Sequence, residues 1–99
     1  MTSKLHIEGG TLTWKDAQGK LHRDNDKPAV ILANGTMYWY QHGKRHREHD
    51  MPAVISGLHT EWWQHGKCHR EQDQPAIVQA NGDKFWYQHD KFIRSEPYN

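Results

Sequence analysis

Three copies of one polar motif contain the residue types that acid–base chemistry uses. The motif reads His-Arg-x-x-Asp, and its members are His22, Arg23, Asp26, His46, Arg47, Asp50, His69, Arg70 and Asp73. A histidine beside a carboxylate and a cation can act as a general base with an orienting group and an anion-binding group. No serine or cysteine nucleophile recurs beside these histidines, and an enzyme with three identical sites on so small a chain would be unusual. We therefore expect no catalytic residue.

The motif has a structural interpretation instead. Arginine and aspartate three residues apart can form a bidentate ion pair across a turn. The histidine ring can pack under a neighbouring tryptophan while it bonds a carbonyl of the turn. We expect all three copies to do this, because every copy must fold and stack on the next.

Histidines at this density also suggest metal ligands. Equivalent residues in successive two-strand units lie about 10 Å apart, too far for His22, His46 and His69 to share an ion with ligands at about 2.1 Å. Within one unit, however, the spacing of His42 and His46 around a turn can bring ligands together. The same holds for the set His65, Cys68 and His69, which is the candidate for zinc. The pattern is incomplete in the other units, so we expect no metal or other cofactor.

Cysteine content and net charge indicate the cellular compartment and exclude some classes of binding partner. Cys68 is the single cysteine, so no internal disulfide can form, and we expect a cytoplasmic protein. It occupies the position that Leu21, Arg45 and Phe92 hold in other units, which predicts a surface or rim thiol of ordinary reactivity. No apolar run approaches the ~18–20 residues that span a bilayer, and the first ten residues lack the apolar segment of a signal peptide. A net charge of +1 gives no bulk attraction to nucleic acid or to an anionic membrane.

The elements that position these residues form a repeat. The string Gly-Lys-x-His-Arg-x-x-Asp-x-Pro-Ala occurs at residues 19–29, 43–53 and 66–76. We expect a single repeat domain with an amino-terminal cap at 1–18, units at 19–42, 43–65 and 66–89, and a carboxy-terminal cap at 90–99. Only 34% of the residues are hydrophobic, so the core is expected to be thin and to depend on the tryptophans.

Each unit carries the signals of a β-hairpin. Short β-branched runs such as Val54-Ile55 begin just after a proline and an alanine. The pairs Asn34-Gly35 and Asn81-Gly82 predict type I′ turns before an aromatic return strand, and a second turn is expected at residues 41–44. We predict an all-β fold: a twisted antiparallel meander of about four tandem hairpins of about 24 residues, with seven or eight strands. The middle unit is one residue shorter around 56–59, which predicts a different turn or register there.

Two stretches carry a family resemblance. Residues 39–46 (Trp-Tyr-Gln-His-Gly-Lys-Arg-His) and 62–69 (Trp-Trp-Gln-His-Gly-Lys-Cys-His) resemble the aromatic-x-x-Gly-Lys-x-His core of MORN-type repeats. They are most similar to the divergent variants found in bacterial immunity proteins, bacteriophages and large DNA viruses, and the resemblance covers roughly residues 10–94. The Arg-x-x-Asp-x-Pro-Ala that follows differs from the ordinary pattern, in which a glycine-rich segment is expected. The resemblance implies a stacked sheet of hairpins used as an interaction surface, not an enzyme.

The aromatic strands divide into two sets by their alternation. The tryptophans at equivalent positions point to one face and are expected to form the core; they are Trp14, Trp39, Trp62 and Trp86. The aromatic residues that flank them point to the other face and vary between units; they are Tyr38, Tyr40, Trp63, Phe85 and Tyr87. Such rings offer rigid contact area at little entropic cost, so this face is either an exposed binding surface or is covered by a second layer.

These features predict a non-catalytic protein-binding module. The resemblance implies a small inhibitor of the kind that phages or mobile elements carry, anti-defence or antitoxin-like, with a host defence or toxin component as its partner in the host cytoplasm. A homodimer is expected because an open sheet leaves two edges. The alternative is binding of a nucleotide or single-stranded nucleic acid, with bases stacked on the aromatic face. The cations that could reach phosphates are Lys44, Arg45, Arg47, Lys67 and Arg70, although neighbouring acids offset their charge.

Overall fold

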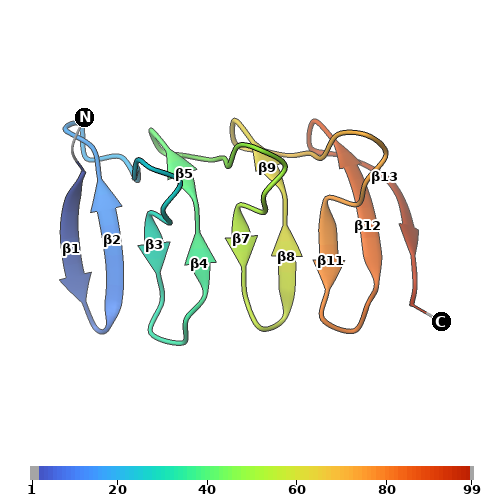
Figure 1. The fold of residues 1–99 in the computed structure, drawn as a ribbon, viewed down its shortest axis with the longest axis horizontal. Helices are drawn as coiled ribbons and strands as arrows, with labels where there is room; N and C mark the ends of the chain where they lie inside the picture. Colours follow the sequence, from blue (N-terminus) through green and yellow to red (C-terminus); the bar gives the residue numbers. More distant parts are fainter. Residues whose placement is uncertain (1–2, 99) are drawn as a thin grey trace.

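The protein is built from antiparallel hairpins arranged side by side in one long sheet (Figure 1). The computed structural model describes residues 3–98, and in this part of the chain it contains strands and no helix. The main sheet has nine strands in the order β1-β2-β3-β4-β7-β8-β11-β12-β13. Their bounds are Lys4–Glu8 (β1), Thr11–Lys15 (β2), Val30–Ile31 (β3), Met37–Tyr38 (β4), Val54–Ile55 (β7), His59–Glu61 (β8), Ile77–Gln79 (β11), Lys84–Gln88 (β12) and Lys91–Glu96 (β13). The prediction of an all-β antiparallel hairpin meander is confirmed.

Two shorter hairpins continue the main sheet at one end of its strands. Strands β5 (Tyr40–Gln41) and β6 (Lys44–Arg45) form one of them, and β9 (Trp63–Gln64) and β10 (Lys67–Cys68) form the other. The described residues form thirteen strands, more than the predicted seven or eight. Part of the excess arises because the strand that carries the aromatic residues, here called the aromatic arm, is interrupted at Trp39 and again at Trp62. The Trp39 N–H donates to Ala53 in the next unit, whereas its carbonyl accepts the His46 N–H, so the pairing changes partner at that residue. In β12 the arm runs through Trp86 without a break.

The turns at the opposite end of the sheet differ from the predicted type I′ turns. In the turn around Asn34-Gly35 only the glycine has a positive φ (92°), and the Gly35 N–H donates to the Leu32 carbonyl. A positive φ at one residue after such a bond indicates a type I turn followed by a left-handed glycine, so the hairpin loop has three residues. The turn at Asn81-Gly82 repeats the arrangement. The shorter middle unit uses a different turn, as predicted, in which the Ser56 N–H donates to the His59 carbonyl.

Positive φ at both central residues, which a type I′ turn requires, occurs instead in the second row of turns. His42 and Gly43 have φ values of 49° and 85°, and His65 and Gly66 have values of 51° and 81°. Each glycine N–H then donates to the preceding unit, from Gly43 to Leu21 at 2.7 Å and from Gly66 to Arg45 at 2.8 Å. These bonds stack the short hairpins on one another.

The core is thin and runs along the whole sheet. Its fully buried apolar side chains are small, and they include the motif alanines Ala29, Ala53 and Ala76. Trp39 and Trp86 are buried as predicted, whereas Trp14 and Trp62 are half-buried. Trp62 keeps part of its ring exposed because it lines an open cleft. Across the described residues, no helix has the length and apolar character that crossing a membrane requires.

Candidate functional site

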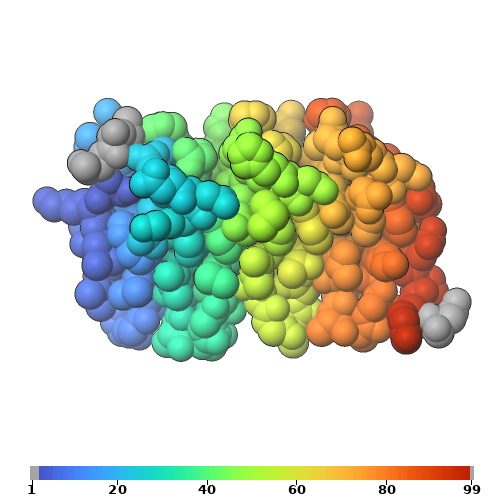
Figure 2. Space-filling model, in the orientation of Figure 1, coloured from blue at the N-terminus to red at the C-terminus, as the bar shows by residue number. Residues whose placement is uncertain are grey.

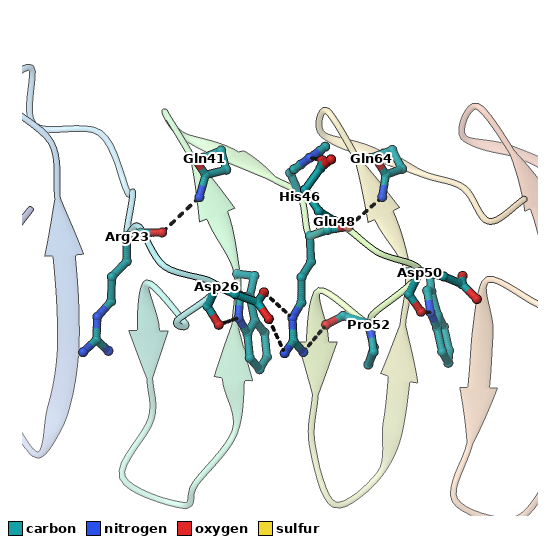
Figure 3. Close-up of polar contacts among 11 residues, drawn as sticks. Arg23, Asp26, Gln41, His46, Glu48, Asp50, Pro52 and Gln64 are labelled. Carbon is teal, nitrogen blue, oxygen red and sulfur yellow. Dashed lines mark hydrogen bonds and ion pairs between the residues drawn. The ribbon is translucent and has the colours of Figure 1, made fainter. Parts of the chain in front are cut away.

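The His-Arg-x-x-Asp motif connects neighbouring units and does not close on itself. Arg47 pairs with Asp26, the aspartate of the preceding copy, at 2.9 Å (Figure 3). Arg70 and Asp50 repeat the contact at 3.0 Å. The prediction of a pair within each copy is therefore wrong. Two consecutive residues of positive φ, such as His49 and Asp50, end each motif and turn the aspartate away from its own arginine.

The same arginine closes over a tryptophan. The guanidinium carbon of Arg47 lies 3.8 Å from the ring centre of Trp39, and its Nη1 donates to the Pro52 carbonyl at 3.0 Å. The Trp39 indole in turn donates to the Asp26 carbonyl at 3.1 Å. Equivalent stacking is found for Arg23 on Trp14, Arg70 on Trp62 and Arg94 on Trp86. The segments 22–29, 46–53 and 69–76, here called the motif loops, therefore cover the tryptophan face of the sheet.

The motif histidines are buried and bond in a repeated way. Nδ1 of His46 accepts the backbone N–H of His65 at 3.0 Å, so the ring proton lies on Nε2 and is donated to Glu48. In the same way, Nδ1 of His22 accepts the backbone N–H of His42, and Nδ1 of His69 accepts that of His89. Each pair of rings also lies close, with 4.1–4.4 Å between ring centres. The predicted packing under tryptophan with a bond to a turn carbonyl is wrong, and both ring nitrogens are already used for structure.

The zinc candidate of the sequence does not assemble as one site. His65 lies against His46, whereas His69 lies against His89. The side chains of the two histidines thus belong to different stacks, and Cys68 lies on the β10 strand between them in sequence.

One other group of potential ligands was not anticipated. In Asp16, His22 and His42 the ligand atoms lie within 4.8 Å of one another. The His22 and His42 rings are stacked with 28° between their planes, so their in-plane lone pairs do not converge on one point. The bond to His42, and then the N–H groups of Lys20 and Gln18 that the carboxylate accepts, hold the pKa of the Asp16 carboxyl below its usual range. The longer first turn, with one extra residue between tryptophan and glycine, was the signal in the sequence for this difference.

Cys68 is buried, contrary to the predicted surface position. Cys68 is only 4% exposed. Burial raises the pKa of its thiol to about 12, and the negative charges of Glu61 and Asp90 add to this increase. Cys68 pairs with Trp63 across the β9–β10 hairpin, and its N–H is bonded by the Asp90 carboxylate at 2.8 Å. A thiol of this kind is inert at neutral pH.

The face opposite the motif loops carries the predicted aromatic set. Tyr38, Tyr40 and Trp63 surround Arg45, whose guanidinium carbon lies 5.1, 5.8 and 5.1 Å from their ring centres. All four side chains are half-buried. We call the surface formed by Tyr38, Tyr40, Arg45, Trp63, Phe85 and Tyr87 the aromatic face. The sequence singled out the rings but missed that Arg45 joins three of them, because its position is occupied by different residue types in the other units.

The rings of the aromatic face pack over buried valines. Tyr38 pairs in register with Val30 and Val54, and Val54 is buried. Residues paired across antiparallel strands share a face, so the rings cover these valines while part of each ring stays exposed. Glu61 lies in the same row, and its carboxylate accepts the Trp63 indole N–H at 2.7 Å and bonds His59 at 2.8 Å. The carboxylate therefore holds Trp63 in place.

The remaining two predicted rings belong to the last hairpin of the sheet. Phe85 and Tyr87 lie on β12, and the Tyr87 ring meets the Phe92 ring edge-on at 5.6 Å. Phe92 is more than half exposed. Of the predicted set, Tyr38, Tyr40 and Trp63 are thus gathered around Arg45, whereas Tyr87 contacts Phe92 and Phe85 pairs with Ile77 and Ser95.

Open clefts lie on both faces. Between the short hairpins, a groove of about 470 Å³ is lined by Tyr40, Arg45 and Trp63 together with Lys44 and Lys67. On the tryptophan face, a cleft of about 570 Å³ lies between two motif loops. Its lining includes Glu48, Asp50, Trp62, Arg70 and Glu71. A smaller cleft of about 360 Å³ occupies the equivalent place over Trp39 (Figure 2 shows the stacked units as a whole).

Comparison of the chain with known protein families, with curated proteins and with solved structures finds no match. The motif loops are engaged in contacts between units, whereas the groove beside Arg45 combines aromatic rings with cations that those contacts do not use.

Proposed function

We propose that this protein is a non-catalytic binding module that captures another protein through its aromatic face. The observation that supports this best is the cluster of Tyr38, Tyr40 and Trp63 around Arg45. Tyrosine, tryptophan and arginine are the residues that most often dominate binding energy at protein interfaces. Half-buried rings of this kind are already ordered, so little conformational entropy is lost when a partner covers them.

A non-catalytic role is consistent with the bonding of the histidines. Each motif histidine uses Nδ1 to accept a backbone N–H and directs Nε2 to a carboxylate, as in His46. A general base needs a free lone pair within reach of a substrate proton. The repeated acid–base groups are thus accounted for by contacts that stabilise the fold.

The class of partner follows from the family resemblance and is part of the proposal. MORN-like variants of this kind imply an inhibitor of phage or mobile-element type, which acts on a bacterial defence or toxin component. Such a role requires only a stable surface and no cofactor.

The test compares variants of the aromatic face in capture from a bacterial lysate, with the bound proteins identified by mass spectrometry. The triple variant Tyr40→Ser, Trp63→Ser and Tyr87→Ser should lose the captured protein. A control variant, Met51→Ser with Leu58→Ser, removes exposed apolar side chains elsewhere and should retain it. Equal capture by both variants would contradict the proposal.

A second variant keeps the test informative if the triple variant unfolds. Arg45→Glu reverses the charge at the centre of the cluster while all rings remain, and we expect a folded protein by circular dichroism that captures no partner. A folded Arg45→Glu protein that still captures the partner would assign binding to another surface.

One observation favours the alternative of nucleotide binding. The groove beside Tyr40 and Trp63 also contains Lys44, Arg45 and Lys67, with Asp90 as the acidic residue of its lining. Rings beside cations can stack bases while the cations contact phosphates. A thermal-shift series with mononucleotides and short single strands tests this, because nucleic-acid binding must weaken steeply as salt is raised. No shift at low salt would exclude this alternative.

A further inference from the structure

The strand at the first end of the sheet has an open edge. Strand β1 lies at one end of the sheet and pairs only with β2 among the described residues (Figure 1). All five of its residues are exposed. Leu5 is 45% exposed and Ile7 is 68% exposed. An unpaired edge presents a row of backbone N–H and C=O groups with which another strand can pair. Strand β1 pairs with β2 in unbroken register, so no bulge in β1 prevents such pairing.

The sequence of this strand is complementary to itself in the antiparallel direction. Read around His6, Lys-Leu-His-Ile-Glu places Lys4 opposite Glu8 of a second copy and Leu5 opposite Ile7 of that copy. Opposite charges and apolar side chains directly across an antiparallel pair are both stabilising. We propose that two copies of this chain associate through β1, with a two-fold axis at His6.

The faces of the strand agree with this register. Leu5 pairs with Trp14 and Ile7 pairs with Leu12 inside the chain, so both apolar side chains lie on the tryptophan face. Lys4, His6 and Glu8 lie on the other face. In the two-fold arrangement each side chain therefore meets its complement on the same face, and the Leu5–Ile7 contacts extend the apolar strip of Leu12 and Trp14 across the junction.

Strand direction explains why the association closes as a dimer. The nine strands of the sheet alternate in direction, so β1 and the opposite edge strand β13 run the same way. Pairing β1 of one copy with β13 of the next, by translation along the sheet, would be parallel and hence less favourable. β13 also carries a bulge, because Arg94 pairs with Trp86 and Phe92 with Tyr87, which leaves Ile93 unpaired. The two-fold β1 contact uses each β1 edge once and cannot continue into a fibre.

The association has a consequence for the aromatic face. A two-fold axis perpendicular to the sheet keeps equivalent faces on the same side, so two aromatic faces lie on one side of a continuous sheet. Self-association and partner capture involve different residues and are measured separately, so either can fail without the other.

The first test is a charge exchange, measured by sedimentation equilibrium over a concentration series. The average molecular mass of the wild-type protein should rise with concentration from 11.7 kDa toward twice that value. A five-residue edge contact is smaller than the interfaces of about 1,200–2,000 Å² that support stable complexes, so the series extends to about 1 mM. Lys4→Glu alone and Glu8→Lys alone place like charges opposite each other and should each weaken the dimer about tenfold.

The decisive comparison restores the charge pairs. The double variant Lys4→Glu with Glu8→Lys, and an equimolar mixture of the two single variants, should both dimerise as the wild type does. Lys91→Glu on the opposite edge is the control and should change nothing. A wild-type monomer throughout the series would overturn the proposal, as would single variants that dimerise like the wild type or a mixture that fails to recover.

The second test reports the register. His6→Cys places two thiols opposite each other at the proposed axis, where Cβ atoms about 4.5–5.5 Å apart lie near disulfide range. Mild oxidation should link this variant into a dimer on a non-reducing gel. Ile93→Cys on the bulged edge, where the residue is also exposed, is the matched control and should stay largely unlinked. Buried Cys68 gives little background, and equal linking of both variants would overturn the register.

Discussion

Replacing Arg47 by alanine tests whether the motif loops hold the fold together. The Arg47 side chain is only 10% exposed. It stacks over Trp39 at 3.8 Å, donates to the Pro52 carbonyl at 3.0 Å, and pairs with Asp26 at 2.9 Å. One side chain therefore joins its own motif loop to two parts of the preceding unit, and Arg47→Ala removes all three contacts together.

The expected loss can be built from these contacts. A partly desolvated cation–π contact contributes about 0.5–2 kcal/mol. The charge-assisted bond to the Pro52 carbonyl contributes about 1.5–3 kcal/mol. The pair with Asp26 contributes about 0.2–1 kcal/mol, because the aspartate side chain is about half exposed and screened by solvent. Since contributions in contact with one another are not additive, we expect a total of about 2–4 kcal/mol. That is a large part of the ~5–15 kcal/mol by which domains are stable.

Urea denaturation measures this loss. Tryptophan fluorescence and far-ultraviolet circular dichroism should give a lower midpoint with an unchanged slope. Arg94→Ala is the matched control, because Arg94 stacks over Trp86 in the same way but is 43% exposed and lies on the edge strand. We expect the control to lose clearly less. An Arg47→Ala protein that is as stable as Arg94→Ala would refute the reasoning.

A double-mutant cycle then separates the ion pair from the stacking. Asp26→Ala, Arg47→Ala and the double variant should give a coupling energy of only about 0.2–1 kcal/mol. A coupling energy that equals most of the Arg47→Ala loss would mean that the ion pair, and not the contact with Trp39, stabilises the loop.

Two further predictions concern the shifted pKa values of Asp26 and Cys68. The hydrogen bond from Arg47 holds the pKa of the Asp26 carboxyl below its ordinary value, so its contribution to stability is complete above about pH 4 and is lost as the pH falls through the lowered value. Asp26→Asn should therefore flatten the fall of Tm in acid, and parallel Tm curves for wild type and variant would contradict this. Burial raises the pKa of the Cys68 thiol to about 12, so a disulfide reagent should modify it at about pH 8 only after urea unfolding. Rapid modification of the folded protein would contradict the burial.

Local structure was predictable because it depends on signals only a few residues long. The β-branched pair after Pro52, the turn at Gly43 and the alternation of Tyr38 with Trp39 each predicted the element that forms. The shorter middle turn was recognised from a missing residue. The type of turn at Asn34 was predicted wrongly, because the same two residues also suit a three-residue loop.

Contacts between units were not predictable to the same degree. The spacing of Arg47 and Asp50 suggests a pair within one copy, and only the stacking distance of the units reveals that Asp26 lies closer. The burial of Cys68 was missed for a related reason. The equivalent positions in the other units hold different residue types, which suggested a surface position. In this unit, however, residue 68 is buried, pairs with Trp63 and is bonded by Asp90.

The contacts between units also explain how one surface can change without the others. A unit in the middle of the chain offers the next unit an aspartate carboxylate and a backbone carbonyl, and it directs an arginine and a glycine N–H to the unit before it. Its motif histidine and its indole N–H are bonded within the unit. The carboxy-terminal cap has Ile93 where the motif histidine would stand, and its strand β13 is the last strand of the sheet. The side chains of Tyr40 and Arg45 bond each other and take part in none of these contacts. Substitutions on the aromatic face can therefore alter what the protein binds while the bonds that stack the units remain, which is the property a variable binding surface on a repeat requires.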